Sequence, residues 1–395
     1  MSLSAKERVP GRAQARRSMR RARLVRPLLR ERSLDALVVA VDGAGPDGAA
    51  GWLRHLLSPR LPVVRALGAF TPGARPVVVL PGRARWTVDG SLGVACRFTG
   101  DGEPLGAELG RALVARGVSR GARLGVVGAD QLRWSDLRAL RAAIGALDVV
   151  EVDDELAPLR AQKDPDELQG VSEAVALAER GLDALMRVAR VGTSLRALGG
   201  EVQRSLLADG AIDSLVLFSH GTDGVCSPVF ADPSAADRRL RADDVLIVGV
   251  EAAGPDGCWA EHARILTFGR VDAEFARACR VAEGAIALFE HHARPGVALG
   301  ALAGQLETYV RDEGFALGHT LGHGIGSDLL EWPPIARAVS AHLRDRMALA
   351  LHPHVVVMRG AASAYLADVL VVEPHGARVL SRREREPWRA PAVRR

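Results

Sequence analysis

The run Leu321-Gly322-His323-Gly324-Ile325-Gly326 is the stretch that decides the fold. Glycine alternates with other residues through a segment that otherwise has the pattern of a strand, and one histidine stands between two of the glycines. Glycine weakens a strand interior unless backbone or a ligand must approach it closely. A histidine held there has an accessible ring, which suits a metal ligand or a proton carrier. The alternative is a glycine-rich turn with an incidental histidine, and the rest of the sequence has to decide between them.

Strand-like and helical patterns predict two domains. Up to residue 150 apolar runs alternate with helical periodicity, which predicts an α/β domain over residues 20–150 with a mixed or parallel sheet. Its strands are expected at 34–40, 77–80 and 124–127, and its helices at 105–116 and 135–144. Two Asp-Pro-like breakers and several charges predict a linker over 151–166.

The second domain is predicted over residues 167–383 and carries a helix pair followed by strands, twice. Its helices are expected at 167–189, 195–209, 272–291 and 299–313, and its strands at 215–218, 245–250, 263–268, 348–352 and 368–372. A C-terminal tail is expected over 384–395. No P-loop or GxGxxG motif occurs that would bind a phosphate. We therefore expect the first domain to be non-catalytic and the chemistry to lie in the second.

Composition and charge exclude several classes of protein. A hydrophobic share of 48% and a charged share of 25% are typical of globular proteins, and no run of 18 apolar residues predicts a membrane span. Residues 1–19 form a basic arm that we expect to be flexible, but no aromatic residue lies among its arginines, so no nucleic-acid partner is expected. The arm lacks the apolar stretch of a signal peptide, which favours a cytoplasmic location. The four cysteines have no CxxC spacing, which argues against a zinc knuckle or a disulfide scaffold.

Ionisable residues interrupt apolar runs at four places in the second domain. An ionisable side chain that faces a core is costly unless it is paired or bound to a metal. Glu261, His323 and His352 supply one carboxylate and two imidazoles, a donor set found with non-haem Fe(II) and with catalytic zinc or manganese. The alternatives are a surface pair between Glu261 and Arg264 and hydrogen-bonded histidines of the core.

The order of motifs resembles the pita-bread metallopeptidase family, which includes methionine aminopeptidase, Xaa-Pro aminopeptidase, prolidase and the metal-free hydrolase creatinase. The segments are WAEHARILTFG from residue 259, GHTLGHGIG from 318, EWPPI from 331, a His-Pro pair at 352–353 and LADVLVVEPHGARVLS from 366. The similarity covers residues 160–381, and the preceding domain resembles the N-terminal domain of creatinase and prolidase. The resemblance implies an α/β N-terminal domain, an α+β pita-bread catalytic domain and a homodimer.

The same resemblance implies an altered metal centre. The family's metallopeptidases bind two metal ions through two aspartates, one histidine and two glutamates. The first aspartate falls at Gly249 or Val250, next to Glu251, and the last glutamate falls at Ala367. Because neither position offers a ligand, a dinuclear centre is not expected.

The remaining ligand positions keep donors of a changed kind. The second aspartate corresponds to Glu261, the histidine to His323, and the first glutamate to His352, which precedes a proline as that glutamate does. The resemblance thus implies at most one divalent metal, Fe, Mn or Zn, at these three residues, and none if the protein works as creatinase does.

Further pocket residues follow from the resemblance. His319 matches a family position that faces the pocket, and the family's upstream histidine corresponds to Cys226 or to Asp232, two alternatives that stay open. His319, His354 and Asp368 are the expected proton carriers. Cys226 is the candidate nucleophile or acid/base of a metal-free enzyme, against the alternative of a buried, inert thiol. The residues expected to contact substrate are Glu331, Arg264, Asp232 and Trp259.

Three functions remain open from the sequence. The first is an enzyme with a mononuclear metal site that acts on a small polar substrate or short peptide with a C–N or amide-like bond. The second is a metal-free, creatinase-like hydrolase or lyase. The third is a protein that only binds peptides or other proteins, because a fold does not fix a function. Ordinary dinuclear aminopeptidase or prolidase activity is not expected.

Overall fold

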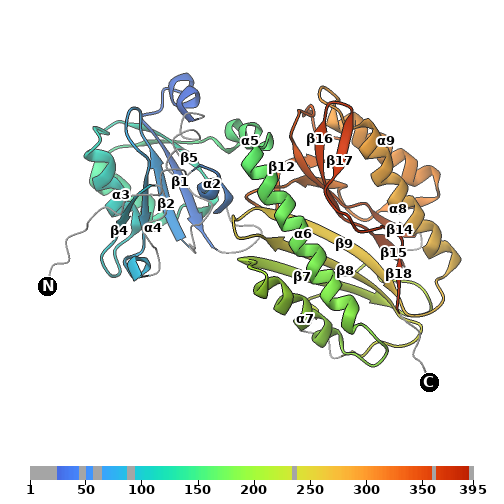
Figure 1. Cartoon of the computed structure of the whole chain (residues 1–395). Helices are drawn as coiled ribbons and strands as arrows, with labels where there is room; N and C mark the ends of the chain where they lie inside the picture. Colours follow the sequence, from blue (N-terminus) through green and yellow to red (C-terminus); the bar gives the residue numbers. More distant parts are fainter. Residues whose placement is uncertain are drawn as a thin grey trace. The chain divides into compact units, whose positions relative to one another are not determined.

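The computed structural model describes residues 25–43, 50–56, 65–86, 94–233, 238–357 and 362–390. The chain divides into two compact units, Met1–Arg160 and Ala161–Arg395 (Figure 1). The predicted basic arm and the end of the predicted tail, residues 391–395, lie outside the described residues.

The N-terminal unit is built on a six-stranded sheet of order β4-β3-β2-β1-β5-β6. The strands are β1 Ala36–Asp42, β2 Arg65–Phe70, β3 Val77–Leu80, β4 Ala95–Phe98, β5 Arg123–Val127 and β6 Asp148–Glu151. The helices are 25–31, α2 Ala50–Leu56, α3 Leu105–Val114, α4 Trp134–Ile144 and α5 Asp153–Ala161, with one-turn helices at Gly82–Trp86 and Ala129–Gln131. Strand β1 pairs antiparallel with β2 and parallel with β5, so the predicted mixed sheet is confirmed.

Both faces of this sheet are covered. Leu37 and Val39 of β1 pack with the helix at 25–31 and with α2, whereas Val38 and Ala40 pack with α3 and α4. A strand buried on both faces needs a continuous apolar run, which is why β1 was recognisable in the sequence.

The predicted linker over 151–166 spans the boundary between the two units, at Arg160 and Ala161, and is largely helical. Residues 153–161 form α5, and α6 begins at Pro165 after a capping box in which Asp164 accepts from the Glu167 amide while the Glu167 carboxylate accepts from the Asp164 amide. The prolines that suggested a linker instead lie inside α5, as Pro158, and at the first position of α6, where proline is tolerated.

The C-terminal unit contains three sheets, of order β18-β9-β8-β7, β12-β11-β13-β16-β17 and β10-β14-β15. The strands are β7 Asp213–Gly221, β8 Val245–Ala253, β9 Trp259–Thr267, β10 Phe315–Leu317, β11 Gly322–Gly324, β12 Glu331–Ile335, β13 Ala348–Leu351, β14 His354–Val357, β15 Ser363–Tyr365, β16 Asp368–Glu373, β17 Gly376–Val379 and β18 Trp388–Arg389. The helices are α6 Pro165–Val188, α7 Leu195–Ala208, α8 Ala273–His292 and α9 Leu299–Asp312. No helix in the described part of the chain is long and apolar enough to cross a membrane.

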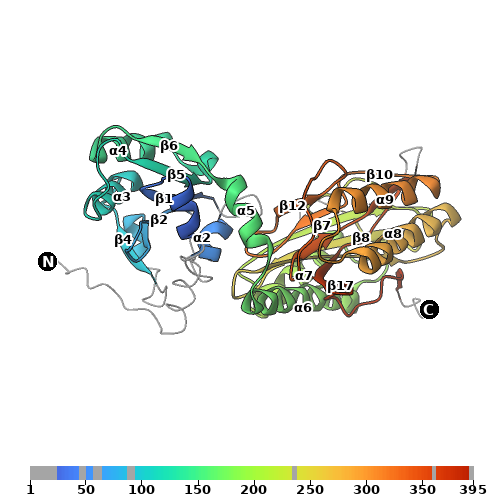
Figure 2. The same cartoon turned by 90° about the horizontal axis from the view of Figure 1, so that it is seen from above.

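Helices cover the sheets of this unit on both sides, α6 and α7 on one side and α8 and α9 on the other (Figures 1 and 2). The two faces of the β8–β9 hairpin separate accordingly. Val248 and Val250 pack with α6 and α7, whereas Ile247 and Ile265 belong to the core with α8 and α9. Because side chains alternate along a strand, Glu261 points to the same face as Ile265, away from α6.

The C-terminal unit extends beyond its predicted end. Trp388 in β18 pairs with Leu266 of β9 in a parallel bridge, and the Ala390 amide donates to the carbonyl of Thr267. Residues 384–390 therefore belong to the fold, and the prediction of a tail that begins at 384 is wrong.

Candidate metal centre

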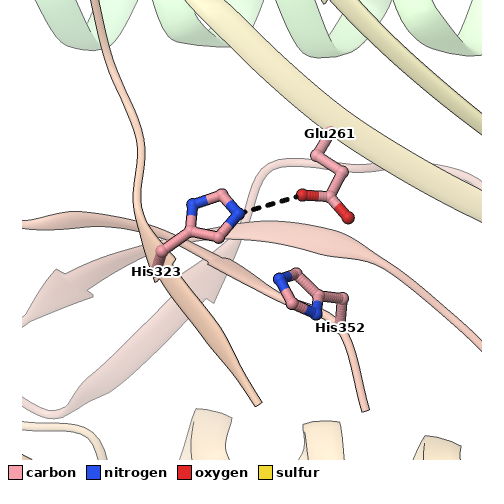
Figure 3. Close-up of side chains that lie close together, drawn as sticks. All are labelled: Glu261, His323 and His352. Atoms are coloured by element: carbon pink, nitrogen blue, oxygen red, sulfur yellow. Dashed lines mark ion pairs between the residues drawn. The ribbon is translucent and has the colours of Figure 1, made fainter. Parts of the chain in front are cut away.

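Three elements bring Glu261, His323 and His352 together. Glu261 lies on β9, His323 lies on β11, and His352 follows the last residue of β13. Strands β11 and β13 are antiparallel neighbours, with His323 opposite Ala350. Figure 3 shows the three side chains converging, and each offers a ligand atom within 4.8 Å of the other two.

The glycines around His323 are explained by close approach. A Cβ at Gly322 would lie 2.0 Å from the carbonyl oxygen of Ala350, and one at Gly324 would lie 2.4 Å from that of Trp332. At Gly326 it would lie 2.7 Å from the Lys163 ammonium. The close approach predicted for this run is confirmed, and what approaches is backbone and a buried lysine.

The ring of His323 is held with one nitrogen facing the carboxylate. Its Nδ1 lies 2.9 Å from the carbonyl oxygen of Gly324, which can only accept, so Nδ1 carries the hydrogen. Its Nε2 lies 3.3 Å from Glu261 Oε2. Burial lowers the pKa of His323, but the hydrogen bond and the charge of Glu261 outweigh this effect and raise it. A nitrogen that faces a carboxylate in this way binds either a proton or a cation between the two groups.

Glu261 is buried and ionised. Burial raises the pKa of its carboxyl group, but the nearby His352 and His323 and a hydrogen bond from Tyr365 outweigh burial and lower it. The Tyr365 hydroxyl donates to Glu261 Oε1 over 2.6 Å, so the two oxygens of the carboxylate have different neighbours.

His352 supplies a neutral imidazole. His352 is buried, and burial lowers the pKa of its imidazole to about 4. Nδ1 of His352 has no hydrogen-bond partner among the described residues. A buried polar atom without a partner typically costs about 1–3 kcal/mol. The donor set and the ring orientation of His323 fit a divalent metal ion.

A group of aromatic and imidazole rings lies beside the three donors. His319 is exposed, and its ring centroid lies 5.1 Å from that of His352 and 5.0 Å from that of His354. His354 is buried, neither ring nitrogen has a hydrogen-bond partner among the described residues, and burial lowers its pKa to about 4. Phe230 packs edge-on against Tyr365 at 5.0 Å and against His354 at 5.9 Å.

Two residues of this group were missed in the sequence. Tyr365 directly precedes the motif segment that begins at residue 366 but carried no distinguishing spacing, and Phe230 lies between the two candidates for the family's upstream histidine. The structure places neither candidate in the ring group: Cys226 is in the core, and Asp232 is exposed.

Known proteins resemble this chain in sequence. Residues 169–374 match metallopeptidase family M24. The chain belongs to this family. It is 20% identical to the Xaa-Pro dipeptidase of Pyrococcus furiosus over 67% of this chain and 74% of that protein.

Solved structures share the two-domain fold. The prolidase of Pyrococcus horikoshii OT3 has a TM-score of 0.78 at 17% identity, covering 93% of this chain and 99% of that one. The dipeptidase PepE of Mycobacterium ulcerans has a TM-score of 0.77 at 22% identity, covering 97% and 100%. The predicted family and the predicted pita-bread fold are confirmed.

The register of β8 places Gly249 and Val250, the two positions at which the family's first aspartate was expected, on opposite faces of the strand. Val250 is paired with His262 and packs against α6 and α7, so it points away from Glu261. Gly249 shares the face of Glu261, and Glu251 lies directly opposite Glu261 on the neighbouring strand. Glu251 is not one of the three donors that lie within 4.8 Å of one another.

Asp368 and Arg264 do not belong to the pocket, contrary to expectation. Arg264 is buried and donates to Asp368, to Ser381 and to four backbone carbonyls, so its guanidinium is saturated by the protein. Asp368 also accepts from Arg385 over 2.7 Å. Burial raises the pKa of Asp368, but Arg264, His262 and Arg385 outweigh burial and hold it well below its usual range. The pair forms a structural ion cluster, because its charges are already satisfied.

Cys226 and Trp259 are core residues. Cys226 is fully buried among apolar side chains, and burial raises the pKa of its thiol to about 11. A thiol in that state is not a nucleophile at neutral pH. Trp259 is buried in an apolar cluster that includes Ile325, which does not support the expectation that it contacts substrate.

Glu331 is committed to an ion pair. It pairs with the Lys163 ammonium, both side chains being almost fully buried, and its Oε1 accepts from the Asp328 amide over 3.1 Å. The expectation that Glu331 binds substrate is therefore wrong. The physical reason is that a buried lysine needs a carboxylate partner.

Proposed function

We propose that this member of family M24 is a hydrolase with a single divalent metal ion, Mn, Fe or Zn, held by Glu261, His323 and His352. The observation that carries the proposal is the convergence of their three ligand atoms within 4.8 Å, with His323 Nε2 facing Glu261. Two imidazoles and a carboxylate are a ligand set of mononuclear catalytic sites.

The positions that would complete a dinuclear centre carry no donors. Ala367 has no ligand atom in its side chain, and the carboxylate of Asp368 is held by Arg264 and Arg385. The face of β8 beside Glu261 presents Gly249 and Glu251, and Glu251 is not among the three converging donors. These residues support a reaction different from that of a dinuclear aminopeptidase.

The substrate that fits is small, polar and amide-like. A divalent ion at the three donors would supply Lewis-acid chemistry, polarising a carbonyl and making water more acidic. Relatives of about 20% identity are named Xaa-Pro dipeptidases, which supports a short peptide or another compound with a C–N bond. The rings of Phe230, Tyr365 and His354 pack edge-on against one another beside the three donors.

His319 is the residue placed to move protons. It is exposed, and its Nδ1 lies 2.8 Å from the carbonyl oxygen of Thr320, so this nitrogen carries the hydrogen. Its Nε2 is then a proton acceptor next to His352, whose ring centroid is 5.1 Å away. An accessible imidazole can exchange a proton between the pocket and solvent.

The decisive experiment measures metal content. The full chain is stripped with chelator, dialysed against Mn(II), Fe(II) or Zn(II), and analysed for metal per chain by mass spectrometry. We expect one ion per chain in the wild type and loss of binding in His323→Ala and Glu261→Gln. The matched control is His375→Ala, which changes an exposed histidine outside the centre and should bind like the wild type.

Two results would overturn the proposal. One is a wild-type chain that binds none of the three ions. The other is hydrolysis of amide substrates that persists unchanged after the metal is removed and in the His323→Ala variant.

A further inference from the structure

Tyr365 makes the shortest hydrogen bond of the centre among the described residues. The residue ends β15, where it is paired with His354 of β14. Its hydroxyl donates to Glu261 Oε1 over 2.6 Å, the length of a strong hydrogen bond to a charged acceptor. Burial and the charge of Glu261 raise the pKa of this hydroxyl well above its ordinary value, so it stays a donor.

We propose that Tyr365 is a positioning residue that holds Glu261 as a one-oxygen ligand and thereby limits the centre to a single metal ion. This inference rests on the proposed metal centre.

The two carboxylate oxygens of Glu261 contact different residues. Oε2 faces His323 Nε2 at 3.3 Å, on the side where the three donors converge. Figure 3 shows this contact from one oxygen while the second oxygen points elsewhere. A carboxylate that bridges two ions must offer one oxygen to each. A second ion at Oε1 would have to share that oxygen with the Tyr365 hydroxyl, whose hydrogen bond already occupies one of its lone pairs.

Packing keeps the tyrosine ring in place. It lies nearly parallel to His352, at 5.8 Å between centroids and 23° between planes. Phe230 and His354 contact it edge-on at 5.0 Å and 5.6 Å. A ring held by neighbours on several sides cannot swing away without disturbing His352, which is itself one of the three donors.

No replacement donor stands where β9 meets the loop before β16. There the backbone of Ala263 pairs with that of Ala367, and both side chains are methyl groups. The next residue, Asp368, gives its carboxylate to Arg264 and Arg385. An ion displaced toward this side would find no side-chain ligand from these residues.

The test uses Co(II), whose visible absorption reports coordination number. In the wild-type full chain we expect one Co(II) per chain at saturation and the strong absorption of a low-coordinate ion. In Tyr365→Phe the freed Oε1 can join the ion, which raises the coordination number and lowers the molar absorption several-fold. The chain has two tyrosines, so Tyr309→Phe, in α9, is the matched control and should reproduce the wild-type spectrum.

The outcomes of this test separate the positioning role of Tyr365 from the existence of the metal centre. A Tyr365→Phe variant with the spectrum, affinity and stoichiometry of the wild type overturns the positioning role and leaves the metal centre standing. A wild-type chain that takes up two Co(II) also overturns it, and this measurement holds even if the variant does not fold. A wild-type chain that binds no Co(II) overturns the metal centre itself.

Discussion

Replacement of Lys163 by methionine should destabilise the C-terminal unit strongly. The Lys163 ammonium pairs with Glu331, and their side chains are 1% and 0% exposed. Methionine keeps most of the apolar stem of lysine but removes the charge, which leaves the Glu331 carboxylate in the interior without its cation. Of the chain's two lysines, this is the one in the C-terminal unit, where arginine supplies every other long basic side chain.

The magnitude follows from the burial of both partners. Removal of one partner from a buried ion pair typically costs about 3–5 kcal/mol. Because Oε1 of Glu331 keeps its hydrogen bond from the Asp328 amide, the lower end of that range is expected. For a unit of this size a loss of about 3 kcal/mol lowers the melting temperature by roughly 6–12 °C.

Thermal and urea unfolding of the full chain measure this loss. The control is Arg378→Met, which removes an ion pair with Glu373 whose side chains are 54% and 43% exposed, and exposed pairs contribute about 0–1 kcal/mol. The double variant Lys163→Met/Glu331→Leu should recover much of the loss, since no charge is left buried. A loss in Lys163→Met no larger than that of the control would refute the reasoning.

Three further predictions concern residues whose role the structure changes. Asp368→Asn should cost about 3–5 kcal/mol at pH 7. The folded-state pKa of Asp368 is depressed, so the carboxylate stabilises the fold above the unfolded pKa of about 4 and loses this effect as the pH falls below that value. In urea unfolding between pH 7 and pH 3, the free energies of unfolding of the wild type and the variant should therefore converge. Cys226→Ala should retain full turnover, and the Cys226 thiol should react with Ellman's reagent only after unfolding, since burial raises its pKa to about 11; a rapid reaction of this thiol in the folded chain would contradict its burial. His354→Phe should leave stability unchanged or raise it by about 1 kcal/mol, because both ring nitrogens of His354 are buried without hydrogen bonds; a clear loss in thermal unfolding would show that the imidazole makes a contact the structure does not.

Sequence patterns predicted most of the elements because burial leaves a periodic trace. The continuous apolar run of β1 reflects a strand that is buried on both faces. The amphipathic periodicity of α6 reflects a helix that is buried on one face. Strands such as β2 and β4 were missed, and β4 has only partly buried and exposed residues. Residues 384–390 gave no signal either, because the parallel pairing of β18 depends on a distant strand.

For the centre, the three donors could be predicted from the sequence, but the residues that contact them could not. Glu261, His323 and His352 were recognisable because they replace ligands of a known motif order, and the structure brings their ligand atoms together. The contact from Tyr365 to Glu261 spans 104 positions. A contact of that range follows from how β15 crosses β9, which local pattern does not encode.

The expectation that Arg264 lies in the pocket with Glu261 could have been avoided, because alternation along β9 places charged side chains on opposite faces of the strand. Glu261 and Arg264 are three residues apart, so a strand must place them on opposite faces. The structure does so: Glu261 faces His323, while Arg264 and His262 face Asp368 on the other side. Arginine on the donor face would compete with a cation for Glu261, whereas on the opposite face it neutralises the carboxylate of Asp368. The separation leaves Glu261 as the one acidic member of the three-donor cluster, and this charge balance suits one divalent ion better than two.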